Sequence, residues 1–220
     1  MESPAAHRII AIDGPAASGK SSVARELARR LRFVYVNSGA MYRAMTWHVL
    51  GNGVATNDVG AIEQLAEKAN ITCHLRSDES VMLIGAVDPE PFLREDRVNE
   101  NVSRVSSVPR VREIIVERLR RYAQSNDLVM EGRDIGSVVF PETPYKFYID
   151  ASPDIRASRR AAQGQRDRIA ARDQADSSRR ASPLIIAEDA HVIDSSNLTI
   201  DGVVGEIVGR LKLKGLTIPA

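Results

Sequence analysis

A glycine-rich segment near the amino terminus constrains this chain more than any other feature. Residues 9–12 (IIAI) form an apolar, β-branched run that is typical of a strand buried on both faces. Residues 14–21 (GPAASGKS) have the spacing of a phosphate-binding P-loop. Val23, Leu27 and Leu31 then follow at helical spacing. The chain therefore places a strand, a glycine-rich loop and a helix in the order that a P-loop requires.

The chemistry of phosphate binding explains the residue types in this loop. Glycine has no Cβ, so backbone N–H groups can converge on phosphate oxygens, and the following helix adds the positive end of its dipole. We expect Lys20 to neutralise charge on the β- and γ-phosphates and Ser21 to present a hydroxyl to Mg²⁺. The sequence thus predicts a site for a nucleoside triphosphate. Its expected residues are Gly14, Pro15, Ala16, Ala17, Ser18, Gly19, Lys20, Ser21 and Ser22.

Composition limits the other possibilities. The 220 residues suffice for one α/β domain with appendages. Lys and Arg number 30 against 29 Asp and Glu, so no basic excess favours a nucleic-acid or membrane surface as a partner. The single cysteine, Cys73, cannot form an internal disulfide, and no apolar run approaches membrane-spanning length. We expect a cytoplasmic monomer that binds neither nucleic acid nor membrane.

Short apolar runs alternate with helical patterns along the rest of the chain. Four runs after the first are predicted to be buried strands, at residues 33–36, 128–130, 145–149 and 190–193. This alternation predicts an α/β fold of P-loop NTPase type with a doubly wound, parallel, five-stranded sheet. Residues 71–76 and 81–84 flank a turn and predict a β-hairpin. We interpret this hairpin as an inserted antiparallel patch outside the central sheet.

Residues 156–180 carry eight arginines and almost no large apolar side chains. Such a segment cannot bury itself, so it is a solvated basic face, a disordered arm or a lid. Arginine rather than lysine favours bidentate binding of anions, and with a P-loop upstream we favour a mobile lid that closes over phosphates. The predicted organisation is a core (1–69), a hairpin region (70–97), more core (98–155), the lid (156–180) and a last core segment (181–220).

Five motifs together resemble the bacterial cytidylate kinase family. They are GPAASGKSS, NSGAMYR, SSVPRVRE, EGRDIGSVVFP and DSSNLTID, and the resemblance extends over almost the whole chain. The P-loop is widely shared, whereas SGAMYR and EGRDIGSVVFP are much more specific. The resemblance implies transfer of the γ-phosphoryl group of ATP, with Mg²⁺, to CMP or dCMP, giving CDP or dCDP in pyrimidine nucleotide metabolism. It also implies that the hairpin region belongs to an enlarged NMP-binding region.

The resemblance further implies roles for individual residues. Those at the acceptor monophosphate would be Ser38, Arg43, Arg133 and Arg179, and those that read the cytosine edge would be Ser103, Arg112 and Asp134. Arg172 and Asp176 would lie near the ribose, and Arg159 would reach the transferring group. The residues expected to act on the transferring group are Lys20, Arg133, Arg159 and Arg179. A base edge with donors and acceptors requires a carboxylate and a guanidinium rather than an apolar pocket.

Three departures from the family pattern bear on the site. Asn37 stands where the family usually has Asp, and the segment between Arg160 and Arg172 is shorter than in longer members. Ser21 follows Lys20 where many relatives have Gly and then Thr, so the hydroxyl that faces Mg²⁺ belongs to Ser21 or Ser22. Two alternatives stay open: another nucleoside-monophosphate or small-molecule kinase, and a P-loop regulatory module without turnover. A regulatory GTPase is disfavoured because the N-K-x-D motif is absent.

Overall fold

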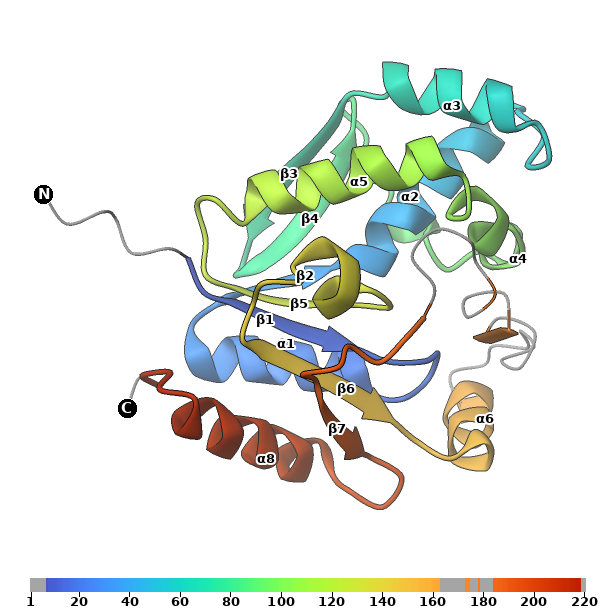
Figure 1. Cartoon of the computed structure of the whole chain (residues 1–220). Helices are drawn as coiled ribbons and strands as arrows, with labels where there is room; N and C mark the ends of the chain where they lie inside the picture. Colours follow the sequence, from blue (N-terminus) through green and yellow to red (C-terminus); the bar gives the residue numbers. More distant parts are fainter. Residues whose placement is uncertain (1–6, 163–172, 175–177, 179–183, 219–220) are drawn as a thin grey trace, which may run out of the picture.

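A single seven-stranded sheet organises the fold. The structure is a computed structural model that describes residues 7–162, 173–174, 178 and 184–218. The strand order is β3-β4-β2-β5-β1-β6-β7, with β1 near the middle (Figure 1). The strands are β1 (Ile9–Asp13), β2 (Val34–Asn37), β3 (Ile71–Arg76), β4 (Glu79–Ile84), β5 (Leu128–Gly132), β6 (Tyr145–Asp150) and β7 (His191–Asp194).

Parallel pairing brings the carboxyl ends of the central strands to one edge of the sheet. β1 pairs in parallel with β5 and β6, β5 with β2, and β6 with β7. Ile10 and Ile12 are fully buried on one side of β1, and Ala11 is fully buried on the other. The five strands predicted from apolar runs are therefore confirmed, with bounds that differ by a few residues at most.

The strand count and the place of the hairpin were wrong. β3 and β4 form the predicted antiparallel hairpin, but β4 also pairs in parallel with β2 at Tyr35 and Glu79, so the central sheet has seven strands. The backbone N–H of Tyr35 donates to the Asp78 carbonyl oxygen at 2.9 Å. Ile71 and Ile84 of the hairpin are buried in the same core as the central strands. The hairpin covers an edge of β2 that would otherwise expose unpaired backbone groups, which is why it joins the sheet.

Helices cover both faces of the sheet. They are α1 (Lys20–Leu31), α2 (Ser38–Gly51), α3 (Val59–Lys68), α4 (Asp96–Val105), α5 (Pro109–Tyr122), α6 (Pro153–Ala162) and α8 (Ile200–Leu213). Helices α1 and α8 lie on one face, and α2, α3 and α5 lie on the other (Figure 1). Two short turns complete the elements, η1 (Glu90–Phe92) and η2 (Ile135–Val139). Among the described helices, none is long and apolar enough to cross a membrane.

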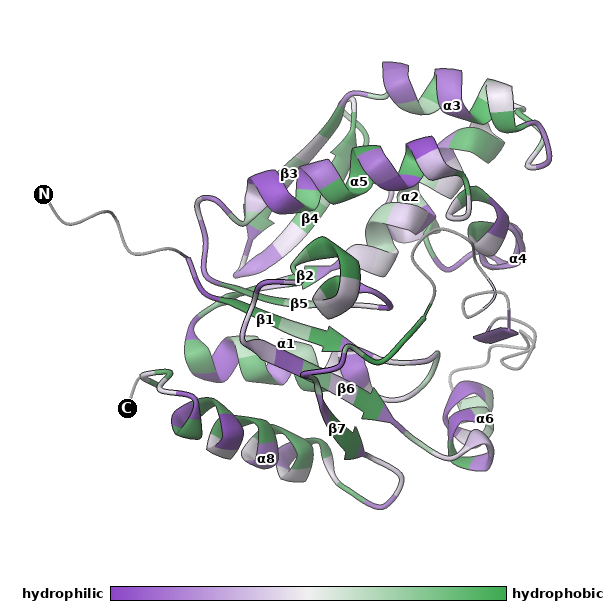
Figure 2. Cartoon of the chain, in the orientation of Figure 1, coloured by the Kyte–Doolittle hydropathy of each residue, from purple (hydrophilic) through white to green (hydrophobic). Residues whose placement is uncertain are grey.

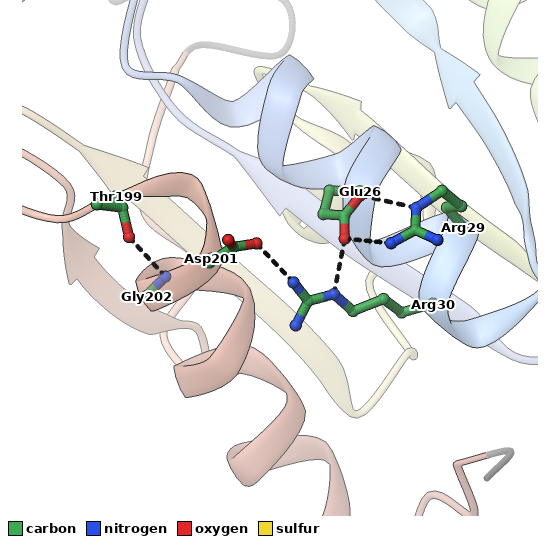
Figure 3. Close-up of polar contacts among 6 residues, drawn as sticks. All are labelled: Glu26, Arg29, Arg30, Thr199, Asp201 and Gly202. Carbon is green, nitrogen blue, oxygen red and sulfur yellow. Dashed lines mark hydrogen bonds and ion pairs between the residues drawn. The ribbon is translucent and has the colours of Figure 1, made fainter.

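Helix α8 is held against α1 by its apolar face. Hydrophobic and hydrophilic residues alternate around α8 (Figure 2), and Val204, Ile207 and Leu211 are fully buried. Thr199 caps the helix by accepting a hydrogen bond from the N–H of Gly202 at 3.1 Å (Figure 3). Ion pairs at the surface contribute little stability, so burial of the apolar stripe fixes the packing of this helix.

The same helix end also carries an exposed ion-pair network that links it to α1. Arg30 contacts Glu26 at 2.7 Å and Asp201 at 2.6 Å, and Glu26 also pairs with Arg29 (Figure 3). Asp201 is 79% exposed, so solvent screens its attraction to Arg30. The network links the amino end of α8 to α1 but contributes little to the free energy of helix packing.

Two leucines in α8 provide a matched test of this packing. Leu211 is fully buried, whereas Leu213 is 82% exposed. We expect Leu211→Ala to lower the free energy of unfolding by about 2–5 kcal/mol, because it removes buried methyl groups and leaves a cavity. Leu213→Ala should change it by less than about 0.5 kcal/mol. Urea unfolding of both variants is the measurement, and equal losses would contradict the packing described here.

Candidate active site

The P-loop joins β1 to α1 at the carboxyl edge of the sheet. Gly14 has φ +152° and Gly19 has φ +90°, both in the region that favours glycine. A Cβ on Gly14 would lie 2.1 Å from the carbonyl oxygen of Ile149, so no other side chain fits there. The predicted order of strand, loop and helix is therefore confirmed, and the loop is held close to β6.

Lys20 opens α1 and points back across the loop. Its side chain is buried, and its Nζ donates to the carbonyl oxygen of Pro15 at 2.8 Å. Two cavities meet at this loop. The cavity nearer β5, called the β5-side cavity, is lined by Lys20 and Ser21 together with Ser38, Arg43, Ser103, Arg112, Arg133 and Asp134. The cavity nearer α8, called the α8-side cavity, is lined by residues 17–23 with Arg159, Ser195, Leu198, Ile200 and Val203.

The β5-side cavity brings together six residues that the sequence distributes over almost a hundred positions. These are the predicted residues Ser38, Arg43, Ser103, Arg112, Arg133 and Asp134. Helix α2 supplies the first two, α4 supplies Ser103, α5 supplies Arg112, and the last two directly follow β5. The parallel sheet achieves this because the elements that carry these residues adjoin the same edge of it.

Arg112 and Asp134 form a buried ion pair in this cavity. Both residues are 3% exposed, and Nη2 of Arg112 donates to Oδ2 of Asp134. The guanidinium also lies over the ring of Tyr42, at 5.1 Å from its centroid, and donates to the carbonyl oxygen of Ser106 at 3.2 Å. Buried charges require such partners, because an isolated buried charge is costly. The pairing of these two residues across 22 positions follows the sequence prediction that they share a site.

Ser38 and Arg43 lie on the first turns of α2. The hydroxyl of Ser38 donates to the carbonyl oxygen of Glu131 at 2.8 Å. Arg43 donates to the carbonyl oxygen of Leu93 at 3.0 Å and to Oδ1 of Asn99 at 2.5 Å. Asn37 caps the helix, since its Oδ1 accepts from the N–H of Ala40 at 3.0 Å. The amide oxygen of Asn37 therefore caps α2 as an Asp carboxylate would.

Arginines of α6 contact the P-loop from the other side. Arg159 donates to the carbonyl oxygens of Ser18 at 3.2 Å and Ser195 at 2.8 Å, which places it on the α8-side cavity. Arg160 lines both cavities. The remaining predicted lid residues, Arg172, Asp176 and Arg179, lie outside the described residues.

The sequence analysis gave no role to one arginine and one aspartate that hold the P-loop. Arg156 pairs with Asp173 and donates to the carbonyl oxygen of Ala16 at 3.2 Å. The carboxylate of Asp173 also accepts from the N–H of Ala16 at 3.3 Å. Both residues belong to the arginine-rich segment, but no spacing rule pairs positions that are 17 residues apart.

Two buried carboxylates were also missed. Glu131 is 3% exposed, lines the β5-side cavity and accepts a hydrogen bond from the hydroxyl of Tyr35 at 3.0 Å. Burial, and then the nearby Glu131 charge, raise the pKa of the Tyr35 hydroxyl. Asp13 accepts backbone hydrogen bonds at 2.7 and 2.8 Å, and burial raises its pKa to about 6. Each carboxylate belongs to the end of a buried strand, and that position is the signal that could have identified them.

Charge and geometry define what this site can bind. Backbone N–H groups, Lys20 and the arginines favour anions, and the two cavities meet at the P-loop. Within the described residues, no group of three His, Cys, Asp or Glu side chains is placed to hold a metal ion.

Comparison with known proteins places the chain in a family. The cytidylate kinase family model matches residues 10–213. A cytidylate kinase of Desulforamulus reducens is 42% identical over 213 residues, which cover 92% of this chain and 96% of the relative. A cytidylate kinase of Streptococcus pyogenes serotype M6 is 41% identical over 207 residues, covering 89% and 92%. The chain described here therefore belongs to the cytidylate kinase family and is a nucleoside-monophosphate kinase.

Proposed function

We propose that this chain transfers the γ-phosphoryl group of ATP to CMP or dCMP, giving ADP and CDP or dCDP. The observation that carries the proposal is the buried Arg112 and Asp134 pair in the cavity that also contains Lys20 and Arg133. A carboxylate and a guanidinium, the groups that a cytosine edge requires, thereby lie beside the P-loop, and the family relatives are named cytidylate kinases. Such an enzyme would act in pyrimidine nucleotide metabolism, as a cytoplasmic monomer.

ATP is assigned to the P-loop and the α8-side cavity. The glycines of the loop leave its backbone N–H groups open to phosphate oxygens. Leu198 and Ile200 are exposed apolar side chains on the far wall of this cavity, which suits the faces of a purine ring. Arg159 donates to the carbonyl oxygen of Ser18 in the P-loop, and we assign it to the transferring group.

Mg²⁺ is assigned to the junction of the two cavities. Ser21 lines both cavities, whereas Ser22 lines only the α8-side cavity, so the Ser21 hydroxyl is the one that we assign to the metal. Glu131 supplies a buried carboxylate to the same space, and hard oxygen donors of this kind suit Mg²⁺. When bound, the metal would neutralise charge on the β- and γ-phosphates.

The β5-side cavity is assigned to the acceptor nucleotide. The Asp134 carboxylate would accept from the exocyclic amine of cytosine, and Arg112 would donate to its acceptor atoms. Nε of Arg112 is buried and has no hydrogen-bond partner among the described residues. Ser103 lines the same wall. We assign Arg43, Arg133 and Arg179 to the acceptor phosphate and Arg172 and Asp176 to the ribose, following the family motifs.

The proposed reaction is a direct in-line transfer between two bound nucleotides. The acceptor phosphate oxygen is already anionic, so the chain needs no nucleophile of its own. Lys20, Arg133 and the arginines of the lid would neutralise the charge that develops on the transferring group. Positioning the two phosphates supplies much of the remaining acceleration.

A coupled assay of ADP production tests the proposal. CMP and dCMP should be phosphorylated at much higher kcat/KM than UMP or AMP, with ATP as the donor. A preference for AMP or UMP would instead support another nucleoside-monophosphate kinase. Tight nucleotide binding without turnover would support a regulatory module.

Replacement of Lys20 tests the P-loop assignment. We expect Lys20→Ala to lower kcat by more than about 100-fold while the thermal midpoint of unfolding changes little, because its charge is needed mainly in the transition state. The control is Lys212→Ala, which removes an exposed lysine near the far end of α8. Turnover within about tenfold of the unaltered chain would contradict the assignment.

Replacement of Asp134 tests base recognition. UMP has a carbonyl where CMP has an amine, so the Asp134 carboxylate would face another acceptor at a cost of about 1–3 kcal/mol. Asp134→Asn offers both a donor and an acceptor, so it should lower kcat/KM for CMP and narrow the gap between CMP and UMP. Asp58→Asn, at the cap of α3, is the control. Equal proportional losses for CMP and UMP would show that Asp134 does not read the base.

A further inference from the structure

Asp13 links the strand that precedes the P-loop to the turn that follows Asp134, and it has no role in the mechanism above. It is the last residue of β1 and directly precedes Gly14 of the P-loop. Its side chain is buried, with 5% exposed. Oδ1 accepts a hydrogen bond from the N–H of Ile135 at 2.8 Å, and Oδ2 accepts one from the N–H of Gly136 at 2.7 Å. The strand that leads into the P-loop therefore holds the backbone of the turn η2.

The turn η2 is too short to satisfy its own backbone groups. The first N–H groups and last carbonyls of any helical turn lack partners within it, and η2 has only five residues. Asp13 satisfies the N–H groups at its start. Arg120 satisfies its far end by donating to the carbonyl oxygens of Val138 and Val139, both at 2.9 Å. Side chains from two other elements thus fix the position of this turn.

This turn sets the position of two residues assigned to the acceptor nucleotide. Asp134 immediately precedes η2, and its carbonyl oxygen accepts from the N–H of Val138 at 2.9 Å. Arg133 precedes Asp134, and Gly132 pairs in register with Asp13. A Cβ on Gly132 would lie 2.6 Å from the Ser38 hydroxyl, so the backbone approaches α2 closely here. A displacement of η2 would therefore move Asp134 and Arg133 relative to Arg112 and the rest of the cavity.

We propose that Asp13 is a positioning residue for the acceptor nucleotide, which it serves by holding the backbone of η2 through two hydrogen bonds to its ionised carboxylate. This inference rests on the proposed function, since the experiment that tests it measures CMP binding. An ionised carboxylate accepts both N–H groups. A protonated one accepts a single N–H and turns an O–H donor toward the other. The geometry of η2 therefore depends on the charge of Asp13.

The groups around Asp13 determine when it is charged. Burial raises the pKa of Asp13 to about 6, and the hydrogen bonds from the two backbone N–H groups lower this pKa and so partly offset the effect of burial. On the β5 side, the Asp134 charge raises this pKa and the Arg133 charge lowers it. On the β6 side, Tyr148 pairs in register with Asp13, and the ammonium of Lys146 is held by Asp189 at 2.8 Å. Asp13 is thus ionised at neutral pH and gains a proton within the range of an ordinary binding experiment.

The test compares CMP binding by Asp13→Asn and by the unaltered chain across pH. At about pH 7.5 the variant should have a Kd for CMP at least about fivefold higher, because its amide N–H₂ faces a backbone N–H. Near pH 5 the two Kd values should agree within about twofold, because protonated aspartic acid and asparagine both offer one acceptor and one donor. The phosphate of CMP also titrates, but its effect cancels in the ratio of the two Kd values.

Asp127→Asn is the matched control. Asp127 is a carboxylate that precedes the opposite end of β5 and likewise accepts from a backbone N–H, that of Arg8, at 2.7 Å. Its replacement should leave the Kd for CMP unchanged at every pH. If Asp13 were merely structural, Asp13→Asn would lower stability, but the ratio of the variant's Kd for CMP to that of the unaltered chain would not vary with pH. A ratio that is constant across pH would therefore overturn the inference, as would unchanged CMP binding by Asp13→Asn.

A second measurement uses the unaltered chain and needs no folded variant. The amide proton shifts of Ile135 and Gly136 should titrate with a midpoint near pH 6, because their N–H groups bind the carboxylate. By linkage, saturating CMP should move this midpoint to lower pH if the ionised form binds CMP better. An unmoved midpoint would overturn the inference. Failure of the unaltered chain to bind CMP at all would refute the proposed function itself.

Discussion

The pairing of β1 on both edges is the constraint on which the rest of the site depends. Ile10 and Ile12 face the core under α1 and α8, and Ala11 faces the core under α2 and α5, so a shift by one residue would reverse every side chain. Because β1 cannot shift, the positions that follow it are fixed as well. Asp13 then reaches η2, and Gly14 passes so close to β6 that a Cβ on it would clash with the carbonyl oxygen of Ile149. The P-loop and the turn η2 are located by the same strand.

The site is built from charges that the fold has removed from water. Arg112, Asp134, Lys20 and Glu131 are all at most 6% exposed, although the chain as a whole is almost neutral. Burial of each such group is unfavourable unless partners replace its hydration. The structure supplies these partners in mixed form: an ion pair and an aromatic face for Arg112, a carbonyl oxygen for Lys20, and a tyrosine hydroxyl for Glu131. Removing one partner would leave the other uncompensated, at a cost in the stability of this region.

Local patterns predicted most of the fold, and contacts between distant segments account for what they missed. The P-loop and five strands followed from apolar runs and glycine spacing, because those signals are local. The hairpin was predicted, but no local pattern in β2 or in β4 predicts that these two strands pair through Tyr35 and Glu79. No local pattern predicted the turn η2, which forms because Asp13 and Arg120 satisfy its ends. The Arg112 and Asp134 pair came from motif resemblance, and the roles of Arg172, Asp176 and Arg179 stay predictions.

Asp13 illustrates how a site residue can oppose stability. Its pKa in the folded chain is about 6, above its ordinary value of 3.8, so the folded state binds the proton more tightly than the unfolded state does. The stability that this group contributes is fully present below about pH 4 and is lost as pH rises through about 6. At neutral pH the ionised carboxylate therefore lowers the free energy of unfolding, by on the order of 3 kcal/mol. A neutral side chain would avoid that cost but could not offer a separate acceptor oxygen to each of the two N–H groups of η2. The charge is retained where the strand leading into the P-loop meets the turn that follows Arg133 and Asp134.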